Sequence, residues 1–500
     1  MGAISQHESV SPTAATPSKH PRALYTLFFT EMWERFSYYG MRALLVLFMV
    51  DAIQHGGMGL TDPIATAIYG LYTASVYLAA LPGGWLADRI FGAQKSVWYG
   101  GITIACGHFV LALPRMETFY FGLILVVIGT GLLKPNVSAL VGELYPEGGA
   151  RRDAGFTIFY MGINLGAALG PLICGALGEK INWHYGFAAA GVGMLAGLIQ
   201  FKMTAHHLGD AGLKPGQSQG LNQSQRFSLA IVLVAIFALV AMVFAGVIRI
   251  NPIALARSTT IVIVAMAVFY FAWLLLWAGL EKAERQRVAV IVILFLAAAL
   301  FWAGFEQTGS SFNFFAQRYT ERKLSLIQFE IPASWFLSLG AVFIISLAPL
   351  VAAMWLFLGR RHLNPSLPVK FGVGLLLLAV GFVVMAGAAK LVATGHKAGP
   401  SWLVATYFIH TLGELCLSPV GLSSVTKLAP RRFVGQLMGT WFLAASLGSL
   451  IAGLIAGEFR TDAVDQMSWQ YLRIGILPVL AGAALILARN PIKRWMAGIE

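Results

Sequence analysis

Residues 31–42 read Glu31-Met32-Trp33-Glu34-Arg35-Phe36-Ser37-Tyr38-Tyr39-Gly40-Met41-Arg42, and they lie inside an apolar run that begins near Ala23 and continues to Val50. The run is long enough to cross a lipid bilayer as a helix. Each charged side chain at the centre of a membrane helix costs roughly 2.5–3.5 kcal/mol on insertion scales, so two carboxylates and two guanidiniums represent on the order of ten. Charges this costly need a partner or a function.

The polar residues of this stretch fall on one face of the helix. Counted from Glu31, the positions Glu34, Arg35, Tyr38 and Arg42 are offset by three, four, seven and eleven residues. The spacing predicts an ion pair between Glu31 and Arg35, with Glu34 and Arg42 left free for other helices, water or a ligand. A purely structural stripe of ion pairs is one interpretation. An ion or substrate path is the other, and intramembrane charges usually mark such a path.

The composition is that of a polytopic membrane protein. Of 500 residues, 58% are hydrophobic and only 11% are charged, and the mean hydropathy is +0.73. The net charge of +13 would suggest a nucleic-acid partner in a soluble protein, but here Lys and Arg concentrate in short turns between apolar runs. That pattern indicates membrane orientation and no nucleic-acid binding.

Apolar runs of spanning length predict an all-α protein with six helices, then two, then six. The expected domains are a disordered cytoplasmic tail (1–22, with no cleaved signal peptide), a first six-helix bundle (23–203), a linker with two extra helices (204–287), a second six-helix bundle (288–490) and a cytoplasmic tail (491–500). Cys106, Cys174 and Cys416 all lie in apolar runs without metal-ligand spacing, so we expect packing residues, no disulfide and no metal site.

The turns expected on the cytoplasmic side are the more basic ones, although Arg318, Arg322 and Lys323 are positive residues on the other side. This bias predicts cytoplasmic termini; its residues are Arg89, Lys95, Arg151, Arg152, Arg360, Arg361, Lys370, Lys427, Arg431, Arg432, Arg489, Lys493 and Arg494. Two six-helix halves with a linker are the layout of transporters that hold substrate between the halves. The turn from Gly84 to Lys95, with Asp88 and Arg89, resembles the signature of the major facilitator superfamily, and we interpret it as a structural turn at the gate.

Three further charges are expected deep in the fourth, seventh and tenth helices of the two bundles. Lys134 is too deep to reach the interface, and a buried lysine favours a carboxylate, for which Glu31 or Glu34 is the candidate. Glu306 lies in an apolar, aromatic setting that is typical of a protonation site. Glu414 is the only acid of its helix and would oppose the basic residues of the first half. Such a cavity suits a zwitterion, as short peptides are.

No nucleophile with a base, metal cluster or phosphate loop is present in the sequence, so enzymatic chemistry has no support and no cofactor is expected. Hydrogen bonds or an aromatic wall could come from further residues of the expected cavity, although membrane aromatic residues are more often packing residues. These residues are Tyr38, Tyr77, Asn164, Asn313 and Trp441. His184 and His410 are assigned to packing or to the membrane interface.

The stretch Glu31-x-x-Glu34-Arg35-Phe36-x-Tyr38-Tyr39-Gly40 resembles the signature of the proton-dependent oligopeptide transporter family. Phe156–Gly166, Phe301–Ser311 and the pair of segments Gly413–Leu415 and Ser418–Pro419 resemble its fifth-, seventh- and tenth-helix patterns. The resemblance implies the major facilitator fold, with two extra helices as in bacterial members, and proton-driven import of di- and tripeptides by alternating access across the inner membrane. The protein is expected to act as a monomer, with protons as the coupling ion.

The resemblance also implies residue roles. Glu31, Glu34, Arg35 and Lys134 would form the coupling and carboxylate-recognition network, and Glu306 would be a protonation site. The substrate carboxyl would lie near Arg42, Tyr38 and Tyr77, with Glu414 toward the amine; the rest of the pocket would be Asn164, Ser418 and Trp441.

One departure concerns the eighth helix, where the family usually has an Asn-Pro pair and this chain reads Leu339-Gly340-Ala341-Val342. An amide expected near the peptide is therefore missing, and Asn313 is a candidate to replace it. Two alternatives to peptide import stay open: transport of another solute, such as nitrate or a modified amino acid, and a peptide sensor without transport.

Overall fold

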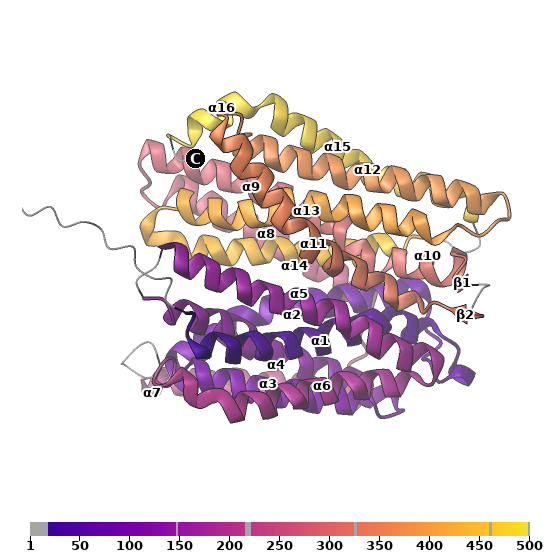
Figure 1. Ribbon diagram of the computed structural model, residues 1–500. Coiled ribbons are helices and arrows are strands. Elements are labelled where there is room, and N and C mark those ends of the chain that lie inside the picture. Colours follow the sequence, from indigo (N-terminus) through magenta and orange to yellow (C-terminus); the bar gives the residue numbers. More distant parts are fainter. Residues whose placement is uncertain (1–18, 147–148, 216–221, 325–327, 460–462, 499–500) are drawn as a thin grey trace, which may run out of the picture.

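The structure is a computed structural model that describes residues 19–146, 149–215, 222–324, 328–459 and 463–498. Nearly all of these residues are helical, and the helices run side by side along one direction (Figure 1). The expected disorder of residues 1–22 falls largely on residues 1–18, which lie outside the described ranges.

The first half contains six long helices, which occupy the lower part of Figure 1. The first helix, α1, packs mainly against α5 and α6, and α3 packs against α4. The bounds are α1 (Arg22–Val50), α2 (Asp62–Leu86), α3 (Ala93–Leu111), α4 (Met116–Glu143), α5 (Gly149–Lys180) and α6 (Trp183–Thr204), with short turns η1 (Ile53–His55), η2 (Ala87–Phe91) and η3 (Ala205–Leu208).

The linker contributes two helices, α7 (Gln223–Phe244) and α8 (Pro252–Leu276). Asn222 and Asn251 cap them by accepting hydrogen bonds from main-chain N–H groups one turn ahead. The α8 helix packs against α2 and α14, so it touches both halves. Most of its large side chains stay exposed, as expected for a helix that faces lipid.

The second half occupies the upper part of Figure 1. Its long helices are α9 (Lys282–Phe305), α11 (Ser338–Arg360), α12 (Leu367–Ala393), α13 (Pro400–Leu428), α14 (Val434–Ala456) and α15 (Val464–Leu487). Shorter elements are η4 (Glu306–Gly309), α10 (Ser311–Tyr319), β1 (Lys323–Leu324), β2 (Phe329–Glu330), η5 (Ala333–Leu337), η6 (Arg431–Phe433) and α16 (Arg489–Trp495). The strands β1 and β2 pair antiparallel.

The helix count agrees with the sequence. Twelve segments of the described chain are long and apolar enough to span a membrane, and α1 and α3 run beside them. The α1 helix falls short of that apolar measure because it carries Glu31, Glu34, Arg35 and Arg42. With those two helices the order is six, two and six, as predicted. One difference is that the seventh helix is not continuous: it is interrupted by the η4 turn at Glu306–Gly309.

Small residues allow helices to approach closely within the first half. A Cβ atom at Gly83 of α2 would lie 1.9 Å from the carbonyl oxygen of Gly131 on α4, and one at Gly166 of α5 would lie 2.1 Å from that of Met32 on α1. The Gly83 contact precedes the turn that carries Asp88 and Arg89, where η2 ends at Gly92 with a positive φ of 77°. Small residues therefore let α2 and α4 approach closely just before this turn.

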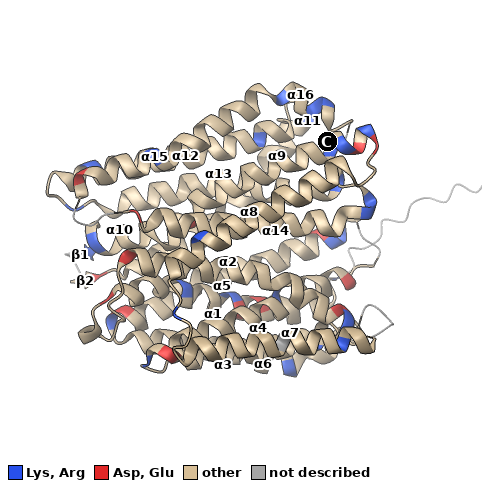
Figure 2. Ribbon diagram, turned by 180° about the vertical axis from the view of Figure 1, so that it is seen from behind, with Lys and Arg blue, Asp and Glu red and all other residues tan. Residues whose placement is uncertain are grey.

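The two ends of the bundle differ in what they carry. Both described ends of the chain lie at one end, together with α16, and we call it the terminal end (Figure 1). Basic residues gather there (Figure 2). The opposite end carries β1, β2 and the turn 51–61 between α1 and α2, and we call it the hairpin end.

Candidate functional site

The charged stretch of α1 forms a compact ionic cluster. Arg35 Nε lies 3.2 Å from Glu31 Oε1 and also donates to Glu34 Oε2, and the three side chains are at most 3% exposed. The guanidinium carbon of Arg35 lies 5.0 Å from the ring centroid of Tyr38. The predicted Glu31–Arg35 pair is confirmed. The prediction that Glu34 stays free is wrong, because Arg35 reaches both carboxylates.

This cluster keeps unused hydrogen-bonding capacity. Glu31 Oε2, Glu34 Oε1 and Arg35 Nη2 are buried without a hydrogen-bond partner among the described residues. Buried polar atoms are costly to leave unpaired, and such atoms require an explanation. A proton on either carboxyl group would convert an acceptor into a donor and change which of these atoms are satisfied.

Lys134 lies beside this cluster without joining it. Its Nζ atom lies 4.7 Å from the ring centroid of Tyr77, and no carboxylate of the described chain lies within 4.0 Å of it. The charges of Glu31 and Glu34 still act on it electrostatically. The predicted direct Lys–Glu contact is therefore not formed in this conformation; a cation–π contact takes its place.

A second ionic cluster joins the two halves. Arg42 of α1 forms an ion pair with Glu306 of η4 and donates from Nε to the hydroxyl oxygen of Tyr69 on α2 at 2.6 Å. All three residues are buried. Arg42 was expected to be available to other helices, and it binds groups on η4 and α2. Glu306 had no basic neighbour in the sequence, and its partner comes from 264 residues away; the break in the seventh helix places it there.

Glu414 lies on α13, in the second half, with Oε2 buried and without a hydrogen-bond partner in the described structure. Its charge acts on Tyr39 of α1 and Tyr160 of α5, so it faces the first half. Tyr160 is 41% exposed. The sequence did not single out Tyr160.

The other predicted pocket residues divide into two groups. Asn164 is buried and its amide donates to the carbonyl of Tyr160 one turn earlier, and Ser418 is half-buried on α13. Asn313 is fully buried and donates to the carbonyl of Ala43 at 2.9 Å, so it ties α10 to α1. Trp441 packs edge-on against Phe371 and is 7% exposed.

The altered segment of the eighth helix packs against α5. Ala341 is buried against Ala167 and Ala168, whereas a Cβ atom at Gly340 would meet nothing within 4 Å. Asn313 Nδ2 is bonded to α1, but its Oδ1 atom is buried without a hydrogen-bond partner among the described residues, so the replacement of the missing amide by Asn313 stays a prediction. Among the described residues, no group of three or more His, Cys, Asp or Glu could hold a metal ion. Cys106 is exposed, Cys174 and Cys416 are buried, and all three are free.

Buried charges of both signs thus lie between two six-helix halves, and at this site the Arg42–Glu306 ion pair connects the halves. Such an arrangement is typical of secondary transporters, which move a charged solute through a site near the bilayer midplane. The fold and the site therefore define a polytopic membrane transporter.

Comparison with known proteins identifies the family. Residues 94–469 match the POT family. The chain is 45% identical to the peptide transporter YePEPT of Yersinia enterocolitica, over 98% of both chains. It is 35% identical to a di-/tripeptide transporter of Lactococcus lactis, over 99% of this chain and 100% of the relative. The crystal structure of a peptide transporter POT in complex with sulfate has a TM-score of 0.89 at 40% identity, covering 97% of both chains.

The chain belongs to the POT family, the family that its sequence resembles. Members of this family are transporters and not enzymes, and the fold is that of the major facilitator superfamily with two extra helices.

Proposed function

We propose that the protein is a proton-coupled symporter that imports di- and tripeptides by alternating access. The observation that carries this proposal is the buried ion pair between Arg42 of the first half and Glu306 of the second. Both partners are needed to keep the halves together at this point, and a proton on Glu306 removes one of the two charges. Protonation therefore acts directly on the contact that must break for the halves to move.

The same pair also provides a binding group for the substrate. When Glu306 takes up a proton, Arg42 becomes available to a peptide carboxylate, which is the bidentate ligand that a guanidinium prefers. Arg35 and the neighbouring Lys134 add positive charge on the same side of the site. Glu414 faces the first half with an unpartnered oxygen, and it is the group we assign to the peptide amine. A zwitterion of peptide length can bind the basic residues through its carboxylate and Glu414 through its amine.

Relatives support the substrate class. The matched proteins carry the names peptide transporter and di-/tripeptide transporter, and the chain covers nearly the whole of each. We place the protein in the bacterial inner membrane with the basic terminal end in the cytoplasm, as the charge bias predicts. It acts as a monomer with protons as the coupling ion and without a bound cofactor.

The test is uptake of a labelled dipeptide into proteoliposomes with a neutral lumen and an acidic exterior. We expect uptake that a protonophore abolishes and that unlabelled di- and tripeptides compete. Competition by nitrate or by a modified amino acid, but not by peptides, would assign another solute. Saturable peptide binding without any flux would indicate a sensor and would contradict the proposal.

A further inference from the structure

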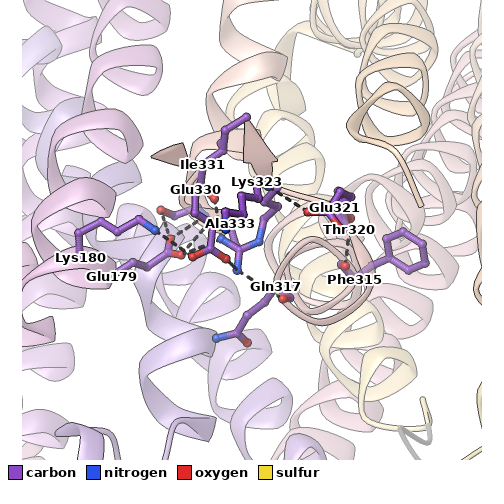
Figure 3. A network of polar contacts seen from close by, with 12 residues as sticks. Glu179, Lys180, Phe315, Gln317, Thr320, Glu321, Lys323, Glu330, Ile331 and Ala333 are labelled. Carbon is purple, nitrogen blue, oxygen red and sulfur yellow. Dashed lines mark hydrogen bonds and ion pairs between the residues drawn. The ribbon is translucent and has the colours of Figure 1, made fainter. Parts of the chain in front are cut away.

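Glu179, in the last turn of α5, binds the first turn of the segment that begins α11. Its Oε2 accepts from the main-chain N–H of Ala333 at 2.7 Å, and its Oε1 accepts from the N–H of Ser334 at 2.8 Å and from the Ser334 hydroxyl at 2.5 Å. Figure 3 shows the Glu179 carboxylate reaching toward Ala333 across the gap between α5 and the second half. Every one of these bonds joins one half to the other.

The chemistry is that of a helix cap supplied by another helix. The first N–H groups of a helix have no partner within it, and a carboxylate is the side chain best suited to accept from them. The η5 turn (Ala333–Leu337) runs directly into α11, and none of its own side chains caps it. Glu179 of α5 provides that cap from the first half.

Other contacts continue along the same face of α5. Trp335 Nε1 donates to the carbonyl of Leu172 at 2.9 Å, and the Ser338 hydroxyl donates to the carbonyl of Ala168 at 2.7 Å. Positions 168, 172, 175 and 179 lie on one helical face. At Gly175 a Cβ atom would come within 2.1 Å of the Ser334 hydroxyl oxygen, so this close approach requires glycine.

The β-hairpin reinforces the contact from its outer side. Arg322 lies 3.9 Å from Glu179 and 3.0 Å from Glu330, and it donates to the carbonyl of Ile331 at 2.5 Å. Lys180 pairs with Glu330 at 3.2 Å (Figure 3). We call Glu179, Arg322, Ala333 and Ser334 the Glu179 cluster. Glu179 and Arg322 are 9% and 12% exposed and their neighbours Lys180 and Glu330 are 34% and 50% exposed, so the cluster lies at the rim of the hairpin end.

At this location the hydrogen bonds of the cluster can break and form again. If α5 and η5 separate, the N–H groups of Ala333 and Ser334 and the carboxylate of Glu179 become accessible to water, which replaces the lost hydrogen bonds at a modest net cost. A site of the same kind deep in the protein would not open readily, because its polar groups would be left unpaired.

From this geometry we infer that Glu179 is a positioning residue of the transport cycle, which holds the hairpin end closed by capping η5 and α11 from the first half. The inference rests on the proposed alternating access and deepens it. Glu179 touches no substrate; it sets the ratio of molecules open at the hairpin end to molecules closed there.

The experiment measures that ratio by electron spin resonance. Nitroxide labels are attached at Ile53→Cys and Thr394→Cys, two exposed positions of the hairpin end in opposite halves, in a Cys106→Ser background because Cys106 is the exposed cysteine. Glu179→Ala should increase the open-to-closed ratio about tenfold, because it removes charge-assisted hydrogen bonds. Glu179→Gln, which keeps one acceptor oxygen, should give an intermediate ratio.

The matched control is Glu458→Ala. Glu458 is an exposed acid whose ion pair with Arg473 lies within the second half, and its loss should leave the ratio unchanged. If Glu179→Ala does not fold, Gly175→Ala offers a second route, because the added methyl group pushes Ser334 away and should raise the same ratio.

Thermal unfolding of each variant separates the two possible roles. A lower unfolding temperature with an unchanged distance distribution would make Glu179 merely structural and would overturn the inference. The distance readout needs no substrate. If Glu179→Ala shifts the ratio but the protein transports no peptide, the inference is supported and the proposed function is contradicted. If the protein transports peptide but the ratio does not change, the proposed function is supported and the inference is overturned.

Discussion

The hairpin end and the terminal end of the bundle are held together differently. At the hairpin end, Asp62 pairs with Arg318 at 2.6 Å, and Glu179 and Lys180 contact the hairpin and η5. Every ion pair that joins the first half to the second, among pairs whose residues are both described, lies at this end or at the central Arg42–Glu306 site. Toward the terminal end, Tyr160 stays 41% exposed opposite Glu414.

This difference shows which gate is closed in the structure. Polar contacts that can be replaced by water hold the hairpin end shut, while the centre of the molecule is held by a pair whose charges can be neutralised by a proton. The conformation is therefore closed at the hairpin end, and the central pair is the contact on which proton binding acts.

The largest expected effect follows from breaking the central pair. Arg42→Ala should reduce gradient-driven uptake roughly a hundredfold or more, because removing one partner of a buried ion pair leaves the other uncompensated at a penalty of roughly 3–5 kcal/mol. Initial rates in proteoliposomes measure this effect. Arg473→Ala, in an exposed pair within one half, is the control. Rates near those of the wild type would show that the central pair does not couple the halves.

The next effect concerns the α1 cluster. Lys134→Ala and Glu34→Gln should abolish gradient-driven uptake but retain part of the exchange measured without a gradient, because they alter the charge balance around Arg35 without removing a contact between the halves. Driven uptake and counterflow are compared in the same vesicles. Unchanged driven uptake in both variants would remove this cluster from the coupling network.

A smaller effect is expected at the amine-binding wall. Glu414→Gln should raise KM for a dipeptide about tenfold, because a charge-assisted hydrogen bond is replaced by a neutral one. The KM for an N-acetylated dipeptide, which lacks the positive amine, should differ little between the wild type and Glu414→Gln. A KM that does not change for the free dipeptide would place the amine elsewhere.

At the hairpin end, transport should tolerate the loss of the Asp62–Arg318 pair. Asp62→Ala should alter transport only a few-fold, because the Asp62–Arg318 pair is partly exposed and such pairs contribute little. The double variant Asp62→Arg with Arg318→Asp should restore the wild-type rate. A swap that stays as impaired as the single change would mean that the pair does more than attract the two helices.

The smallest expected effect is that of external pH on the Lys180–Glu330 ion pair. Burial raises the pKa of Glu330, but the Lys180 hydrogen bond and the charges of Arg322 and Lys180 outweigh it and hold the pKa below 4.5. A depressed pKa means that the pair is present above 4.5 and is lost only as pH falls through the lower folded value. External acidification from about pH 7 to 5 should therefore not release the hairpin. A carboxyl titration of Glu330 followed by NMR checks this point.

The sequence predicted the helices well because spanning runs are long and apolar, and the bounds of α1, Arg22–Val50, lie within a residue of the expected run from Ala23 to Val50. It predicted the Glu31–Arg35 pair because both partners lie on one helix. The Arg42–Glu306 pair could not be predicted, since it depends on how α1 meets a helix broken 264 residues later.

The contacts of the hairpin end were hidden for a related reason. Glu179 lies at the end of an apolar run and resembles any interfacial acid, and its partners are main-chain N–H groups that leave no pattern in a sequence. The donor contact of Asn313 was hidden in the same way: its amide nitrogen holds α10 to α1, because a buried donor takes a nearby free carbonyl.

The coupling of proton movement to peptide movement is tested by following both in one experiment. A pH-sensitive dye is enclosed in proteoliposomes that have no initial pH gradient, and an unlabelled dipeptide is added outside. In the wild type, peptide entry should acidify the lumen, and Glu306→Gln should remove the acidification while peptide exchange remains. Peptide entry at the wild-type rate without any acidification would contradict this coupling.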